Sequence, residues 1–265
     1  MAPIGYAILI GAGPTSGAGI ARVLADPSLG NMAVALLARN AENLRSLCSE
    51  VRRTSHGGEL HAFPSDTSPA SLRRAFGEIG AHAAFAGLRL RLAVYHVKHA
   101  PRAPFLDTPA EDFARSLEEY AGGAFAFAQE AVRVMYAQSG DSGEKGKKEK
   151  GEKGGQLEKK GTVIFTGTLG ALRTNPTYAA YGAGRSAVRM VAQALGKEHS
   201  AGGIHVVHAI ANGAIGDATA ADDPDVRAGR KMSAESVGKT YLWLSRLEPD
   251  LWIDELDMRP AQERW

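Results

Sequence analysis

Short apolar runs alternate with longer amphipathic stretches along most of the chain. The short runs have the length and composition of buried strands, whereas the longer stretches repeat apolar residues at helical spacing. Strands that alternate with helices predict an α/β fold in which helices cover both faces of a parallel sheet. We therefore expect a doubly wound sheet of the Rossmann type in a single domain spanning residues 1–265. Its seven strands are expected at 6–10, 32–38, 59–64, 90–95, 162–166, 205–210 and 252–255.

Helix start signals agree with this alternation. Ser68 and Ser233 stand at positions where N-cap residues are preferred, and Pro69 occupies a first helical position. The helices are expected at 17–25, 41–54, 68–80, 109–138, 178–200 and 233–247.

One segment, residues 139–160, breaks the pattern. It consists mostly of Gly, Lys and Glu and cannot contribute to a core. We expect a disordered surface loop, because long loop insertions cost little entropy; a docking tail is the alternative. From 141 to 160 the segment holds seven Lys and five acidic residues, so the rest of the chain is formally neutral.

Composition narrows the class of partner. With 265 residues, 44% of them hydrophobic, the chain can bury one large core. A formal net charge of +2 favours neither a nucleic acid nor a membrane surface, so a small-molecule substrate is expected. Cys48 is the sole cysteine, which excludes an intrachain disulfide and fits a packed thiol in a reducing compartment. No apolar run reaches the roughly 18 residues that cross a bilayer, and we expect a cytoplasmic protein.

A glycine-rich turn follows the first strand. It reads Gly11-Ala-Gly13-Pro-Thr-Ser16-Gly17-Ala-Gly19 and opens the first helix. Glycines allow a backbone to approach a pyrophosphate closely, and a helix N-terminus supplies free N–H groups. Similar turns also occur without a ligand. Its position at the start of an alternating strand-helix pattern favours a dinucleotide site.

A tyrosine and an arginine stand four residues apart in Tyr178-Ala-Ala-Tyr181-Gly-Ala-Gly-Arg185, which places both on one helix face. Thr168 lies 13 residues before Tyr181. Such a pair is common on any helix when it stands alone. Here, however, the pair occurs together with the glycine turn and the predicted order of strands. In these features the chain resembles the short-chain dehydrogenase/reductase family over nearly its full length, apart from the 139–160 insertion.

The resemblance implies a catalytic role for three residues. Tyr181 would be the general acid in carbonyl reduction, and Thr168, in place of the family serine, would orient the substrate carbonyl. Arg185 replaces the family lysine: it supplies the positive charge that a phenol needs but does not release a proton, so a lysine-borne relay would be lost. Tyr120 stands in place of the family asparagine, which leaves Tyr181 as the one unchanged catalytic position.

The resemblance also implies a cofactor site. Against the family loop Gly-x-x-x-Gly-x-Gly, one register uses Gly13, Gly17 and Gly19, and the favoured one uses Gly11, Thr15 and Gly17. Gly11, Gly13, Ser16 and Gly17 would then contact the cofactor.

Arg39 and Asn40 end the second strand, where the adenosine ribose would lie. Arg39 can clasp a 2′-phosphate, which favours NADP(H) over NAD, although an exposed arginine capping a strand end is the alternative. Asp66 and Thr67 match the family position that binds adenine; Asp66 alone would be read as a turn or N-cap residue.

Two further contacts with the cofactor follow from the resemblance. His96 replaces part of an Asn-Asn-Ala-Gly run and would face the cofactor, and the backbone N–H of Ile215 would meet the carboxamide. His205 and His208 lie three residues apart on a strand and face opposite sides, so no metal site is expected.

The sequence thus predicts an NADP(H)-dependent oxidoreductase that reduces a carbonyl or imine of a small molecule, with Thr168, Tyr181 and Arg185 as catalytic residues. Two alternatives remain open. The same cleft could perform a non-redox isomerisation or cyclisation, or the protein could be a catalytically silent NADP(H) sensor. The resemblance further implies a homodimer or homotetramer formed through the helices that contain Tyr120 and Tyr181.

Overall fold

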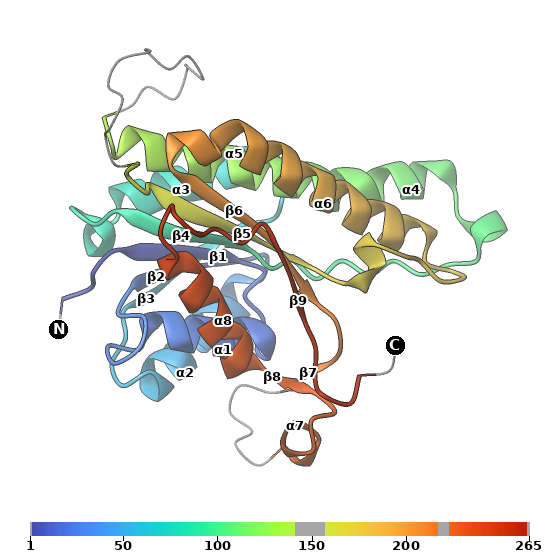
Figure 1. The fold of residues 1–265 in the computed structure, drawn as a ribbon, viewed down its shortest axis with the longest axis horizontal. Coiled ribbons are helices and arrows are strands. Elements are labelled where there is room, and N and C mark those ends of the chain that lie inside the picture. Colours follow the sequence, from blue (N-terminus) through green and yellow to red (C-terminus); the bar gives the residue numbers. More distant parts are fainter. Residues whose placement is uncertain (1, 141–156, 217–222, 264–265) are drawn as a thin grey trace.

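Seven parallel strands form one sheet in the order β3-β2-β1-β4-β5-β6-β9 (Figure 1). The computed structural model describes residues 2–140, 157–216 and 223–263. The strand order reverses between β1 and β4, and this switch point opens a crevice at the carboxyl ends of the strands. The strands are β1 (Tyr6–Ile10), β2 (Ala33–Ala38), β3 (Leu60–Pro64), β4 (Leu90–Tyr95), β5 (Gly161–Gly167), β6 (Ile204–Ala211) and β9 (Glu255–Met258).

Helices cover both faces of the sheet, as the alternation predicted (Figure 1). One core lies beneath α3 (Pro69–Ala81), α5 (Gly123–Ala137) and α6 (Ala179–His199), and the other beneath α1 (Ser16–Ala25), α2 (Ala41–Thr54) and α8 (Ala234–Arg246). Ile8 and Leu9 show the cause, since neighbouring strand residues point to opposite faces and each enters a different core. The predicted doubly wound α/β fold is confirmed.

The predicted helix starts are confirmed at two positions. Ser68 accepts a hydrogen bond from the Ser71 backbone N–H at 3.3 Å, and Ser233 accepts one from the Ser236 N–H at 3.0 Å. Short elements β7 (Ile215–Gly216), α7 (Pro224–Arg227) and β8 (Met232–Ser233) lie beside the crevice end of β6. None of the described helices combines the length and the apolar character needed to cross a membrane.

The single long helix predicted at 109–138 is wrong. The chain forms α4 (Ala110–Leu117), then a π-helical turn over Glu118–Gly122, then α5. A π turn holds extra residues per turn and re-aims the side chains around it. Here it carries Tyr120, which is 1% exposed, into the interior beneath the crevice. Apolar spacing averaged over the whole stretch does not reveal such a local change.

The last strand begins later than the predicted 252–255. Trp252 stacks on the His205 ring with centroids 5.1 Å apart, and the Ile253 carbonyl lies 3.0 Å from His205 Nε2. These contacts hold the segment before the strand, and pairing with β6 starts at Glu255. The apolar Trp252-Ile253 pair therefore packs as an anchor for the strand. The predicted loop 139–160 lies outside the described residues except for 139–140 and 157–160.

Candidate active site

The glycine turn after β1 is tight where the backbone requires it. Gly11 has φ +86°, and a Cβ there would lie 2.3 Å from the His96 carbonyl oxygen. A Cβ on Gly17 would lie 2.9 Å from Ala12 Cα. Gly11 and Gly17 are therefore the loop glycines that the fold demands, which is consistent with the favoured register. Gly19 serves another purpose, because it lets α1 pack against Ala234 of α8.

The same turn leaves donors free for an anion. No side chain caps the N-terminus of α1, and a Cβ on Gly13 would have no neighbour within 4 Å. The first N–H groups of a helix carry partial positive charge and need acceptors. An open glycine beside an uncapped helix start therefore fits a pyrophosphate group.

A cavity of about 240 Å³ continues from this turn along the ends of β2 and β3, and Arg39, Asp66 and Thr67 line it. The exposed Arg39 guanidinium makes no hydrogen bond or ion pair within residues 2–140, 157–216 and 223–263. Hydrogen bonds from the Ser68 side chain and backbone lower the pKa of Asp66. Arg39 and Lys98 are the two cations among the residues that line this cavity, and Arg39 is the one at the end of β2.

Two other predicted contacts serve the protein itself. Asn40 accepts a hydrogen bond from the Asn43 N–H at 2.9 Å as the N-cap of α2, and its side chain does not line the cavity. Thr67 donates to the Glu119 carbonyl at 2.7 Å and so ties the β3–α3 loop to the π turn. Their roles toward a cofactor stay predictions.

His96 joins three elements. Its Nε2 lies 2.7 Å from Ser16 Oγ at the start of α1, and its Nδ1 lies 2.9 Å from Thr166 Oγ1 on β5. Thr166 Oγ1 is also 2.7 Å from the Tyr241 hydroxyl of α8. Burial, reinforced by the charge of Arg185, lowers the pKa of His96 to about 4. The imidazole is therefore neutral near pH 7 and can both donate and accept, which suits two hydroxyl partners.

Tyr181 and Thr168, two of the predicted catalytic residues, lie in direct contact. The Tyr181 hydroxyl, near the start of α6, lies 2.6 Å from Thr168 Oγ1, immediately after β5. Gly170 permits this approach, because a Cβ there would lie 2.4 Å from Tyr181 Cε1. Two hydroxyls in mutual contact can bind the same substrate oxygen, one orienting it and the other donating a proton.

Arg185 is buried below this pair. It is 5% exposed, and its guanidinium carbon lies 5.1 Å from the Tyr181 ring centroid and 4.3 Å from that of Tyr120. The guanidinium donates to the Tyr120 hydroxyl, to the His99 carbonyl at 3.2 Å and to the Thr166 carbonyl at 3.4 Å. The predicted charge thus stands against the face of Tyr181. Its terminal nitrogens donate to the protein, so a contact with a ribose stays a prediction.

Tyr120 acts as the counterpart of Arg185 in this network. Burial raises the pKa of Tyr120 to about 12, so the phenol stays neutral. The Tyr95 hydroxyl donates to the Tyr120 carbonyl at 2.8 Å, and the His99 ring stacks on the Tyr120 ring at 5.8 Å. Sequence reasoning missed His99; a second ring three residues after His96 was the available signal.

A second cavity, of about 460 Å³, opens beside Tyr181. Arg102, Asn212 and Tyr178 are among its lining residues, and the Arg102 guanidinium lies 4.5 Å from the Tyr178 ring centroid. Ile215 is half-buried in β7 and does not line this cavity or the one at Arg39. Within the described parts of the chain, no three His, Cys, Asp or Glu side chains gather as metal ligands.

Neither a protein-family model nor a curated protein matches this sequence. Solved structures match its fold over almost the whole length. A short-chain dehydrogenase from Rhodopseudomonas palustris is 24% identical with a TM-score of 0.73, covering 97% of this chain and 98% of the other. L-sorbose reductase from Gluconobacter frateurii, complexed with NADPH and L-sorbose, is 14% identical with a TM-score of 0.76, covering 100% and 99%.

An alcohol dehydrogenase from Thermococcus sibiricus, complexed with 5-hydroxy-NADP, is 16% identical with a TM-score of 0.74, covering 98% of both chains. At these identities the likeness establishes the architecture. The chain has the fold of the short-chain dehydrogenases and reductases, and the resemblance seen in the sequence is confirmed at that level.

The Tyr120–Arg185 contact should contribute measurably to stability. Tyr120→Phe leaves a buried guanidinium N–H without its acceptor, and we expect a loss of about 1.5–3 kcal/mol in the free energy of unfolding by urea. Tyr95→Phe is the matched control: its hydroxyl donates to a neutral carbonyl, and its loss should cost about 1 kcal/mol. An equal or smaller loss for Tyr120→Phe would show that the guanidinium does not depend on this phenol.

Proposed function

We propose that the protein is an NADP(H)-dependent oxidoreductase that reduces a carbonyl or imine group of a small molecule. One observation carries the proposal: the Tyr181 and Thr168 hydroxyls lie 2.6 Å apart beside a cavity of about 460 Å³, with a buried guanidinium against the Tyr181 ring. Such a pair can hold and protonate one substrate oxygen or nitrogen.

The residues at the glycine turn fit a dinucleotide. The uncapped start of α1 and the open face of Gly13 would hold the pyrophosphate, and Arg39 would hold a 2′-phosphate. When bound, NADPH supplies the hydride. The protein's task is to place the substrate, exclude water and deliver a proton.

Tyr181 donates that proton from its hydroxyl as negative charge develops on the substrate, and Thr168 keeps the acceptor atom in line. The guanidinium of Arg185 stabilises the phenolate that forms, because opposite charge favours the ionised state. Arg185 releases no proton at working pH. The phenol must therefore regain its proton from water that enters through the substrate cavity or from the product side.

Tyr181→Phe tests the general acid. We expect NADPH consumption over a panel of aldehydes, ketones and iminium compounds to fall by about 10²–10⁴-fold, with NADPH binding retained. Tyr136→Phe is the matched control, because Tyr136 lies on α5 and contacts His199; its turnover should equal that of the wild type. A wild-type protein that binds NADPH without consuming it would support the silent sensor, and substrate conversion without NADPH loss would support isomerisation.

Arg39→Ser tests the choice of cofactor. Removing the cation should weaken NADPH binding by about tenfold or more, while NADH binding stays the same, because NADH lacks the 2′-phosphate. Fluorescence titration measures both affinities, and the exposed Arg53 of α2 offers a matched control as Arg53→Ser. Equal losses for NADPH and NADH would assign Arg39 to a different role.

We also propose that two copies pair through α5 and α6. Phe125 and Met190 are 52% and 50% exposed, and both line a groove of about 290 Å³ between these helices. Sedimentation should show a dimer or tetramer that Phe125→Glu dissociates. Leu106→Glu, at a residue that is 94% exposed elsewhere, should leave the assembly unchanged. A monomeric wild type would contradict the pairing. The cytoplasmic location stays a prediction.

A further inference from the structure

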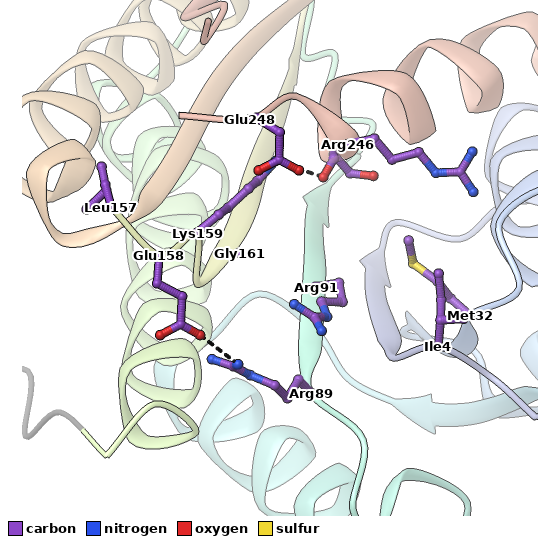
Figure 2. Close-up of a pocket in the computed structure, with 11 residues that line it drawn as sticks. Ile4, Met32, Arg89, Arg91, Leu157, Glu158, Lys159, Gly161, Arg246 and Glu248 are labelled. Carbon is purple, nitrogen blue, oxygen red and sulfur yellow. Dashed lines mark hydrogen bonds and ion pairs between the residues drawn. The ribbon is translucent and has the colours of Figure 1, made fainter. Parts of the chain in front are cut away.

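A cavity of about 680 Å³ lies at the edge of the sheet opposite the glycine turn (Figure 2). Its walls come from residues before or at the amino ends of the strands, including Met32 before β2, Arg91 in β4 and Gly161 in β5. The end of α8 closes it. The length of a seven-residue strand, roughly 20 Å, separates this edge from the carboxyl edge. A ligand here would not overlap a dinucleotide.

Basic side chains outnumber acidic ones around this cavity. The two carboxylates among its lining residues are Glu158 and Glu248. The four cations are Arg89, Arg91, Lys159 and Arg246. This imbalance of charge in a concave site concentrates positive potential and attracts anions.

Three of these four cations have hydrogen-bond partners that account for the positions of their charged groups. Arg89 donates to Glu158 Oε1 at 2.8 Å and to Ser139 Oγ at 2.6 Å, although its Nε is buried without a partner. Arg246 donates to the Leu29 carbonyl at 2.5 Å.

Lys159 caps the end of α8. Its ammonium donates to the carbonyls of Ser245 at 2.8 Å and Leu247 at 2.5 Å, as cations do at helix C-termini. An ammonium has three donors, so one stays available. Burial lowers the pKa of Lys159 to about 8; the carboxylate of Glu248 opposes this shift and the guanidinium of Arg91 reinforces it.

Arg91 has no such explanation. Its guanidinium makes no hydrogen bond or ion pair with any residue in the described ranges, and it acts electrostatically on both Lys159 and Glu158. Figure 2 shows its side chain among those of Arg89, Glu158 and Lys159. Arg91 and Lys159 carry like charges, and these repel one another. An anion between them would remove that repulsion.

We propose that this cavity binds a multivalent oxyanion, held by Arg91 together with the free donors of Arg89 and Lys159. The planar fork of a guanidinium matches the paired oxygens of phosphate and carboxylate groups. A volume of about 680 Å³ exceeds what one phosphate fills, which favours a ligand with several anionic groups. The site is independent of the proposed reductase activity, because it uses the other edge of the sheet.

Titration calorimetry with pyrophosphate at low ionic strength tests the site. The titration uses Gly13→Asp protein, because a carboxylate at that open position repels phosphate from the glycine turn. We expect saturable binding that Arg91→Gln weakens by about tenfold or more. Arg115→Gln removes an equal charge from α4, where Arg115 pairs with Asp112, and should bind as tightly as its parent. A parallel titration with citrate shows, by comparison of the two affinities, whether the site prefers a polycarboxylate or a polyphosphate.

Proton linkage supplies a second readout. Near pH 8 about half of the Lys159 side chains are neutral, and a bound anion would raise the pKa of Lys159 and draw a proton onto it. Binding measured in buffers of different ionisation enthalpy should therefore show more proton uptake for Gly13→Asp than for Gly13→Asp combined with Lys159→Met. The difference cancels the proton exchange of pyrophosphate itself.

Two results would overturn the proposal. The first is no saturable binding of pyrophosphate or citrate to Gly13→Asp protein; if the wild type binds, this result assigns all of its binding to the glycine turn. The second is binding that Arg91→Gln and Arg115→Gln leave equally unchanged. Failure of NADPH turnover would not affect any of these measurements.

Discussion

The burial of one permanent positive charge governs the carboxyl edge of this sheet. Arg185 is 5% exposed, and its hydrogen-bond acceptors are the Tyr120 hydroxyl and the carbonyls of His99 and Thr166. A buried charge must be compensated by hydrogen bonds or by an opposite charge. These acceptors come from the π turn, the segment after β4 and β5. The guanidinium therefore fixes three elements relative to one another.

Compensation by neutral acceptors has a chemical consequence. A carboxylate partner would cancel the charge, whereas carbonyls, a phenol and two ring faces leave it largely undiminished. Its field reaches the neighbouring groups, since it contributes to the lowered pKa values of His96 and His99. The guanidinium carbon also lies 5.1 Å from the centroid of the Tyr181 ring. The burial of Arg185 and the chemistry proposed for the site therefore depend on the same contacts. A side chain that could lose its proton would support the packing and the chemistry less reliably.

The sequence could predict what depends on local periodicity. Buried parallel strands are mostly apolar, so β1 and β4 were located to the residue even though β4 contains Arg91. N-caps such as Ser68 were recognisable because capping needs only a short polar side chain before a helix. The π turn was not predictable, since it changes the helix locally and the apolar spacing averaged over residues 109–138 does not reveal it. The start of β9 was missed because an apolar pair that anchors a segment has the same composition as a strand.

Side-chain partners were harder still to predict. Asn40 and Arg39 are adjacent and both polar, yet Asn40 caps α2 and Arg39 faces a cavity without a partner among the described residues. His96 was expected to face a cofactor, and that role stays a prediction; the sequence did not indicate that its two nitrogens meet hydroxyls from α1 and β5. The hydrogen-bond partner of such a side chain is supplied by an element that lies far away in the sequence. Residue type and spacing restrict the candidates, and only the packing of those elements selects among them.

Each of these two edges of the sheet carries an arginine without a partner among the described residues, and the surroundings of that arginine decide which ligand we propose for it. At the carboxyl edge, the fold creates a crevice where strand order reverses between β1 and β4, and Arg39 follows the neighbouring strand β2. At the amino edge no general rule provides a site. Leu157, Glu158 and Lys159 line the cavity there, and this segment is tied to the end of α8 by Lys159 and to Arg89 by Glu158. Those contacts engage Arg89 and Lys159 in anchoring the segment, whereas Arg91 makes no hydrogen bond or ion pair with a described residue. A cation that the fold itself does not use, at the wall of a cavity of about 680 Å³, is the physical basis for proposing a ligand at that edge.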